Sequence, residues 1–203
     1  MKGYYFITDA ILSRAGNFSD VRNALRAGVR VVQYRNKCGS TKAMHEEALS
    51  LRALCKDILF IINDRIDIAL SVGADGVHLG QEDLPYASAR KLLGKKKIIG
   101  MTVHSVAEAK RAQSLGADYI GVSPIFTTQT KNDAGKALGV TIIEKIKKEV
   151  QLPLVAVGGI DLINAAFVIT AGADSLCAIS AVIRKANVKN EIEKFQRLFK
   201  NSR

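Results

Sequence analysis

Two aspartates stand at the ends of two apolar runs. Asp64 follows "LFIIN", and Asp83 comes soon after "GVHLG". If the two runs are neighbouring strands, the two carboxylates, with water and substrate oxygens, suit Mg²⁺, because this ion prefers oxygen ligands. Both aspartates also precede predicted helices, and Arg65 is adjacent to Asp64. Taken alone, helix capping or a salt bridge is the simpler interpretation of each.

The segment "QYRNK" carries two cations next to an amide. In an extended strand Gln33, Arg35 and Lys37 point to one face, whereas Tyr34 and Asn36 point to the other. Cations on the inner face of a barrel strand are costly to bury unless an anion meets them. In the alternative interpretation the strand has ended by Arg35 and the charges belong to a loop. The segment alone leaves both interpretations open.

Two further segments suit an anion. The segment "SPIFTTQTKNDAGKALG" is too long for a simple turn, and its Thr128, Thr130 and Lys131 could surround a negative group. "VGGI" precedes a predicted helix, and Ser180 ends the last predicted strand. Barrels hold phosphate after their seventh and eighth strands. An ordinary loop and a plain Gly-Gly turn remain the alternatives.

The histidines give weaker evidence for a catalytic site than the residues above. His45 lies in a predicted surface helix, and for His78, within a strand, we expect a packed, hydrogen-bonded role. His104 follows a strand and could touch a ligand, and Thr102 lies on the same face. The sequence has no Ser-His-Asp spacing, no H-E-x-x-H and no P-loop. None of these standard catalytic motifs therefore applies.

Short β-branched runs alternate with amphipathic stretches such as 41–55 and 105–116, which is typical of βα units around a parallel sheet. The predicted strands, by sequence, are "YYFIT", "VRVVQYR", "LFIIN", "GVHLG", "KIIGMTV", "YIGVSP", "LPLVAVG" and "SLCAIS". No linker divides the chain. We expect one α/β domain over 1–203. The candidate site residues described in the preceding paragraphs lie at or after the ends of its strands.

A faint repeat distinguishes between the possible sheets. "AGV" at 27–29 and "GAD" at 73–75, 116–118 and 172–174 each precede an even-numbered strand, and each Gly suits the end of a helix. A unit of two βα pairs repeated four times predicts a (β/α)₈ barrel, or TIM barrel. The rival, an open doubly wound sheet, predicts a Gly-rich fingerprint after the first strand, and "YYFITDAILSRAG" has none.

Composition limits the classes of partner. No apolar run approaches the roughly 20 residues of a membrane span, and the N-terminus has no secretory signal, so we expect a cytoplasmic protein without membrane contact. The net charge of +11 suggests anionic partners, but no nucleic-acid motif accompanies it. The cysteines form no C-x-x-C pair, which argues against a disulfide framework and a zinc site: Cys38, Cys55 and Cys177.

Taken together, the strand ends closely resemble thiamine phosphate synthases. The segments that carry the resemblance occur in the family's order over nearly the whole chain: "ITD", "AGVRVVQYRNK", "NDRIDIALSVGADGVHLGQEDLP", "IIGMTVH", "GADYIGVSPIFTTQTK", "VAVGGI" and "AGADSLCAIS". Two departures are visible. Thr102 stands where Ser is common, which keeps the hydroxyl, and Ser123 stands where Gly is common.

The resemblance implies a (β/α)₈ barrel that joins 4-amino-2-methyl-5-hydroxymethylpyrimidine diphosphate to 4-methyl-5-hydroxyethylthiazole phosphate. It implies that the pyrimidine diphosphate is bound by Gln33, Tyr34, Arg35, Asn36, Lys37, Asn63, Thr102 and Lys131. The thiazole phosphate would be bound by Thr128, Gln129, Thr130, Gly159, Ile179 and Ser180, and Mg²⁺ by Asp64 and Asp83.

The reaction that the resemblance implies begins with loss of pyrophosphate and ends with capture of a pyrimidine-stabilised carbocation by the thiazole nitrogen. It needs no protein nucleophile. The departing diphosphate needs compensating charge, which Mg²⁺, Arg35, Lys37 and Lys131 could supply as the catalytic groups.

Two alternative functions remain compatible with the sequence. Related thiazole tautomerases share the barrel but lack the full metal pair and carry a His in the loop after the sixth strand, where this chain has Pro124. The basic charge also allows a catalytically silent protein that binds phosphate ligands or nucleic acid. The oligomeric state stays open, and a homo-oligomer is compatible with the sequence.

Overall fold

The computed structural model describes residues 1–128, 130 and 135–201, and strands and helices alternate along them. The strands are β1 (Gly3–Ile7), β2 (Val31–Tyr34), β3 (Leu59–Asn63), β4 (Gly76–Leu79), β5 (Ile98–Val103), β6 (Tyr119–Val122), β7 (Leu154–Val157) and β8 (Ser175–Cys177). The helices are α1 (Asn17–Arg26), α2 (Thr41–Leu54), α3 (Ile66–Ser71), α4 (Tyr86–Leu93), α5 (Val106–Leu115), α6 (Thr141–Glu149), α7 (Ala165–Thr170), α8 (Ile179–Ile183) and α9 (Val188–Asn201). Within these described ranges, no helix has the length and apolar character to cross a membrane.

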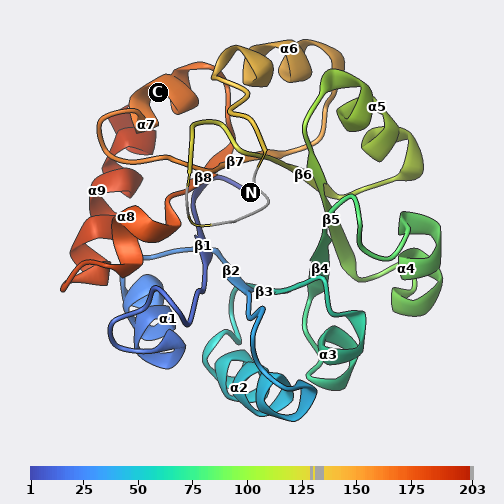
Figure 1. Cartoon of the computed structure of the whole chain (residues 1–203), viewed down its shortest axis with the longest axis vertical. Coiled ribbons are helices and arrows are strands. Elements are labelled where there is room, and N and C mark those ends of the chain that lie inside the picture. Colours follow the sequence, from blue (N-terminus) through green and yellow to red (C-terminus); the bar gives the residue numbers. More distant parts are fainter. Residues whose placement is uncertain (129, 131–134, 202–203) are drawn as a thin grey trace.

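The strands form a closed barrel in which each is parallel to its neighbours in sequence order. Pairing of β1 with β8, through Gly3 opposite Ser175, closes the ring. The helices surround it, and α9 packs against α1 and β1 (Figure 1). The predicted (β/α)₈ barrel is confirmed as a single domain. The alternative prediction, an open doubly wound sheet, is wrong.

Every predicted strand is present, but several end earlier than their composition suggests. The last predicted strand, 175–180, stops at Cys177, and its final residues open helix α8 instead. The second, predicted over 29–35, is a strand only over Val31–Tyr34. Arg35 and Lys37 therefore follow the strand, as the loop interpretation of "QYRNK" held.

Alternate residues of the strands fill the barrel interior. The interior cluster consists of Tyr5, Ile7, Val31, Ile61, Tyr119, Val155 and Cys177, and the larger core lies between the strands and the helices. Two glycines make room for polar interior side chains. A Cβ on Gly100 would lie 2.1 Å from Cζ of Tyr119, and one on Gly121 would lie 2.8 Å from Cε1 of His78. The glycines thus admit side chains that reach the barrel mouth.

The GAD repeat has a physical explanation. Its glycines and the one at 28 have positive φ of 65–102° at the ends of α1, α3, α5 and α7, so the predicted helix-ending role is confirmed. Each GAD aspartate accepts a 2.8 Å hydrogen bond from a backbone N–H near the start of the preceding odd-numbered strand. Each also pairs with a cation from the helix that comes before that strand. The sets are Asp75 with Phe60 and Arg52, Asp118 with Ile99 and Arg90, and Asp174 with Leu154 and Lys147.

Candidate active site

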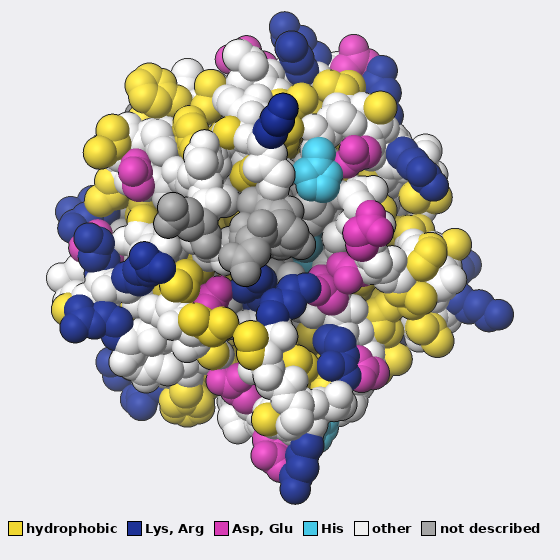
Figure 2. Space-filling view, in the orientation of Figure 1, with side chains coloured by type: hydrophobic (Ala, Val, Ile, Leu, Met, Phe, Trp, Pro, Cys, Tyr) yellow, Lys and Arg dark blue, Asp and Glu magenta, His cyan; other side chains and the backbone are white. Residues whose placement is uncertain are grey.

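A pocket opens at the carboxyl ends of the strands, which is the functional face of this barrel type. Residues from all eight strands or the loops that follow them line it, namely Tyr5, Ile7, Gln33, Arg35, Asn63, His78, Thr102, Tyr119, Gly121, Ser123, Pro124, Thr128, Thr130, Val155, Val157, Gly158, Gly159, Ile160, Cys177, Ile179 and Ser180. Acidic and basic side chains lie beside one another near the centre of this face (Figure 2). The pocket is therefore lined by both apolar and polar side chains, and charged side chains lie around its mouth.

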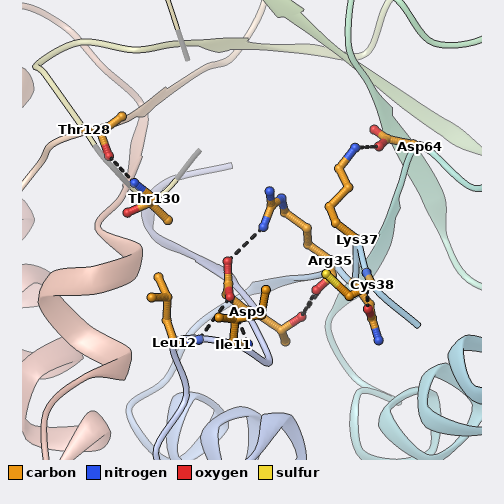
Figure 3. Close-up of polar contacts among 11 residues, drawn as sticks. Asp9, Ile11, Leu12, Arg35, Lys37, Cys38, Asp64, Thr128 and Thr130 are labelled. Atoms are coloured by element: carbon orange, nitrogen blue, oxygen red, sulfur yellow. Dashed lines mark hydrogen bonds and ion pairs between the residues drawn. The ribbon is translucent and has the colours of Figure 1, made fainter. Parts of the chain in front are cut away.

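Gln33 and Arg35 both line the pocket, so their side chains face the same way, although Arg35 already lies in the loop after β2. Arg35 is held by a carboxylate that the sequence analysis did not single out, because its Nη1 lies 2.8 Å from Oδ2 of Asp9. The other oxygen of Asp9 accepts backbone hydrogen bonds from Ile11 and Leu12. Asp9 is thereby fixed in the loop after β1, and it fixes Arg35 in turn (Figure 3).

Tyr34 and Asn36 lie elsewhere, on the helix side of β2. Tyr34 Oη donates to Glu47 Oε2 at 2.6 Å, and Asn36 Nδ2 donates to Tyr34 Oη at 3.3 Å. Asn36 Oδ1 of the side-chain amide accepts hydrogen bonds from the backbone N–H groups of Cys38 and Gly39. Neither side chain lines the described pocket, so both shape the loop after β2 and the structure offers no ligand contact for them.

Asp64 and Asp83 converge beside Lys37, outside the residues that line the pocket but next to the lining residue Asn63. Lys37 forms an ion pair with Asp64, and Asp83 Oδ2 accepts a 2.6 Å hydrogen bond from the Gly80 N–H. Burial, and next the neighbouring Asp64, raise the pKa of Asp83. Such crowding of two carboxylates is relieved by a bound cation, and their oxygens match the ligands that Mg²⁺ prefers. The residues present therefore fit that ion.

The capping interpretation of these aspartates was wrong. Helix α3 begins after Arg65 and helix α4 after Pro85, and neither start has a side-chain cap. The predicted salt bridge exists for Asp64, but its partner is Lys37, because Arg65 pairs with Asp67 instead. Asp64 also has a positive φ of 60°, which is uncommon for a residue other than glycine.

Asn63 and Thr102 line the wall between these charges and the floor. Thr102 Oγ1 lies 2.9 Å from Nε2 of His78. His104 is exposed and pairs with Glu108, at 3.1 Å, so its side chain is engaged outside the pocket. Of the two candidates after β5, Thr102 is the one that the structure brings to the site.

The opposite wall carries hydroxyls and glycines. Thr128, Thr130, Gly159, Ile179 and Ser180 line the pocket there. Figure 3 shows Thr128 and Thr130 across from Arg35 and Lys37. A Cβ on Gly159 would lie 2.5 Å from the Thr127 carbonyl oxygen, so only glycine lets the loop after β6 rest on this turn. Two further predicted residues, Gln129 and Lys131, lie outside the described residues.

A shallower hollow continues from this wall. It is lined by Thr128, Thr130, Gly159 and Ser180 and extends to Arg184 and Lys185 at the end of α8. Sequence reasoning missed these two cations because they follow the last strand by a helical turn and look like ordinary surface charges. They add positive charge beside the hydroxyl wall.

Sequence reasoning also missed four residues from β1 and the loop after it, from β4 and from β6. Asp9 holds Arg35, and Tyr5, His78 and Tyr119 lie on the pocket floor. His78 was expected to be hydrogen-bonded, which is confirmed, but it also faces the pocket. Inward parity was the available signal, since Tyr5 and Ile7 alternate with outward residues in β1.

Known proteins with similar sequences belong to one enzyme family. A model of the thiamine monophosphate synthase family matches residues 4–182. The thiamine-phosphate synthase of Methanosarcina barkeri is 50% identical over 201 residues, covering 98% of this chain and 91% of the relative. That of Chloroflexus aurantiacus is 48% identical over 187 residues, covering 91% and 86%.

A solved structure agrees with the sequence relatives. The thiamine phosphate pyrophosphorylase from Pyrococcus furiosus superposes with a TM-score of 0.90 at 38% identity, covering 98% of this chain and 96% of that one. These matches confirm the resemblance drawn from the strand ends, and the chain belongs to the thiamine monophosphate synthase family.

Proposed function

We propose that the chain condenses 4-amino-2-methyl-5-hydroxymethylpyrimidine diphosphate with 4-methyl-5-hydroxyethylthiazole phosphate, giving thiamine phosphate and pyrophosphate. The relatives at up to 50% identity bear the name of this activity. The observation that carries the proposal is the division of one pocket into two anion-compatible sides. Arg35 lines one side, with Lys37 and Asp64 close by, and hydroxyls and glycines line the other.

The charged side suits the diphosphate. Arg35 presents a planar fork of donors, part of which Asp9 engages, and Lys37 presents a point charge next to Asp64. Asp64 and Asp83 would hold Mg²⁺, which when bound supplies positive charge to offset that of the diphosphate. Lys131, in the loop after β6, is proposed as a third cation on the basis of the family resemblance.

The hydroxyl side suits the thiazole phosphate. Thr128 and Ser180 offer hydroxyl donors, and Gly159 brings backbone close to the pocket. Arg184 and Lys185 add positive charge from the adjoining hollow. Anchoring this phosphate would hold the thiazole nitrogen near the reacting methylene, which removes much of the entropic cost of bringing two substrates together.

The proposed reaction is dissociative. The bond between the pyrimidine methylene and the diphosphate oxygen breaks, and its electron pair leaves with pyrophosphate. The thiazole nitrogen then donates its lone pair to the methylene cation and forms the new C–N bond. Arg35 and Lys37 stabilise the charge on the leaving group. No protein nucleophile is required.

Both substrates, incubated with the protein and Mg²⁺, should yield thiamine phosphate and pyrophosphate in equal amounts. Asp83→Ala should abolish nearly all turnover and leave the circular dichroism spectrum unchanged, as should EDTA with the wild type. Asp67→Ala is the matched control, because Asp67 lies three residues from Asp64 but pairs with Arg65. Full activity of Asp83→Ala or of the chelated enzyme would refute the metal assignment.

A further inference from the structure

A carboxylate behind the pocket joins three segments that lead to its charged side. Glu47 lies in helix α2, is half-buried, and is not among the described residues that line the pocket. Its Oε2 accepts a 2.6 Å hydrogen bond from Tyr34 Oη, at the end of β2, and its Oε1 accepts one of 2.9 Å from Asn17 Nδ2, at the start of α1. Asn36 Nδ2 lies 3.3 Å from Tyr34 Oη and 3.5 Å from Glu47 Oε2. One side chain therefore holds β2, the loop after β2 and the start of α1.

The donors that meet Glu47 have little access to water. Tyr34 and Asn17 are each 2% exposed. Burial, and next the hydrogen bond to Glu47, raise the pKa of Tyr34, so the hydroxyl keeps its proton and is the donor. Without the carboxylate, both side chains would retain a buried donor that lacks an acceptor, which costs free energy unless they move. Glu47 thus determines where these two side chains lie.

Asn36 connects this cluster to the backbone around Lys37. Its Oδ1 accepts from the backbone N–H groups of Cys38 and Gly39, at 3.0 and 2.9 Å, and so fixes the two peptide units that follow Lys37. The amide also packs tightly against the turn, because a Cβ on Gly39 would lie 2.8 Å from Asn36 Nδ2. From this turn Lys37 reaches Asp64, with which it forms an ion pair (Figure 3). The direction of Lys37 therefore depends on the Asn36 amide.

The loop after β1 is held by the same carboxylate. This loop ends where α1 begins, at Asn17, and helix α1 packs against α2 (Figure 1). Asp9, near its beginning, holds the Arg35 guanidinium, and Thr8 Oγ1 accepts a 2.9 Å hydrogen bond from the Arg35 backbone N–H. Glu47 therefore restrains both loops from which Arg35 takes its direction.

We propose that Glu47 is a positioning residue for the cations that bind the diphosphate, an inference that rests on the function proposed above. Glu47 acts through Tyr34 and Asn36 and does not touch the ligand. Arg35 and Lys37 keep their charges without it but lose their fixed directions. Cations that are ordered before an anion arrives bind it more tightly than cations that must first be ordered, because less entropy is lost on binding.

The sign of the effect separates positioning from electrostatics. A carboxylate repels a nearby anion, so the loss of its charge alone would strengthen pyrophosphate binding. Glu47→Ala and Glu47→Gln lose the same charge but differ in geometry. The glutamine carbonyl can still accept from Tyr34, and its NH₂ group can donate to Asn17 Oδ1, a buried atom without a hydrogen-bond partner in the described part of the chain. The Asn17 amide needs only to turn over.

Isothermal titration with inorganic pyrophosphate and Mg²⁺ tests the proposal. We expect Glu47→Ala to bind pyrophosphate at least roughly tenfold more weakly than the wild type, and Glu47→Gln to stay within about threefold of it. In both variants the affinity for 4-methyl-5-hydroxyethylthiazole phosphate should change by less than about twofold, because that anion binds on the other side of the pocket.

Glu46→Ala is the matched control. Glu46 precedes Glu47 in α2 and carries the same charge, but it is exposed. Both affinities of this variant should stay within about twofold of the wild type. If Glu47→Ala fails to fold, Asn36→Ala breaks the connection to the turn after Lys37 while Tyr34 still donates to the carboxylate. It should weaken pyrophosphate binding in the same selective way.

Unchanged pyrophosphate binding in Glu47→Ala, an equal loss in Glu47→Gln or in Glu46→Ala, or an equal loss for the thiazole phosphate would each overturn the inference. The expected pattern in a protein that forms no thiamine phosphate would refute the proposed function and leave the positioning role standing. Formation of thiamine phosphate by a protein whose Glu47→Ala variant binds pyrophosphate as the wild type does would refute the positioning role alone.

Discussion

Asp9 Oδ2 lies 2.8 Å from Nη1 of Arg35, and both side chains are largely buried, at 6% and 15% exposure. The pair joins the loop after β1 to the loop after β2 and sets the direction in which Arg35 faces the pocket. Water screens the attraction within such a pair less than in an exposed one, and removal of one partner would leave a buried charge without compensation.

Asp9→Asn should raise KM for the pyrimidine diphosphate by roughly tenfold, because the guanidinium is no longer held in one direction. KM for the thiazole phosphate should change by less than about twofold, since its side of the pocket is separate. Steady-state kinetics with each substrate varied in turn provide the measurement. Glu149→Gln removes an exposed pair with Lys110 and should leave both constants unchanged. An unchanged pyrimidine KM in Asp9→Asn would contradict a positioning role for Asp9.

Much of the fold follows from local signals. Alternation of apolar runs with amphipathic stretches predicts parallel βα units, and the glycines of the GAD repeat mark where α3, α5 and α7 end. Strand ends are harder to predict, because hydrophobicity does not distinguish a strand from a buried helix. Ile179 looks like part of "SLCAIS", yet it opens helix α8.

The GAD aspartates stabilise the barrel by a common device, so their loss should have a common effect. Asp75→Ala, Asp118→Ala and Asp174→Ala should each lower the free energy of unfolding by about 1–3 kcal/mol, because a strand N–H loses its acceptor and a cation its partner. Urea denaturation followed by circular dichroism measures this. Glu193→Ala, which removes a surface pair with Lys189, is the control and should have a much smaller effect. Losses no larger than the control would show that these hydrogen bonds are dispensable.

The candidate site was only partly predictable. Polar residues at or after the ends of apolar strands mark Gln33, Arg35, Asp64 and Asp83 as candidates, although each, taken alone, also fits a structural role. The floor hydroxyls could not be found in this way. Tyr5 and Tyr119 belong to β1 and β6, and only closure of the barrel brings their oxygens to 2.8 Å.

Asp20 should make stability depend on pH. It is 1% exposed in the first turn of α1, and burial raises its pKa, although the Ser13 hydroxyl at 2.6 Å partly offsets this. The folded state therefore binds the proton more tightly than the unfolded state, so Asp20 contributes less stability as pH rises from its ordinary value of 3.8 through the raised value.

Asp20→Asn resembles the protonated form and should raise Tm at pH 7. The gain over the wild type should shrink as the pH is lowered towards 3.8, where the wild-type carboxyl is itself protonated. Thermal melts between pH 4 and 8 test this. Ser13→Ala removes the offsetting hydrogen bond and should make the pH dependence steeper. A gain of equal size at every pH would mean that the charge of Asp20 is not its cause.

Gly159 offers a test of the hydroxyl wall. Its φ is +63°, and an added Cβ would lie 2.5 Å from the Thr127 carbonyl oxygen, so Gly159→Ala must displace the loop that carries Thr128. We expect KM for the thiazole phosphate to rise at least roughly tenfold and KM for the pyrimidine diphosphate to rise much less. Gly73→Ala is matched in backbone strain, with φ +65°, but has no atom within 4 Å of the new Cβ. It should lose stability without a selective change in either KM, and the same result for Gly159→Ala would argue that the loop after β6 takes no part in holding the thiazole phosphate.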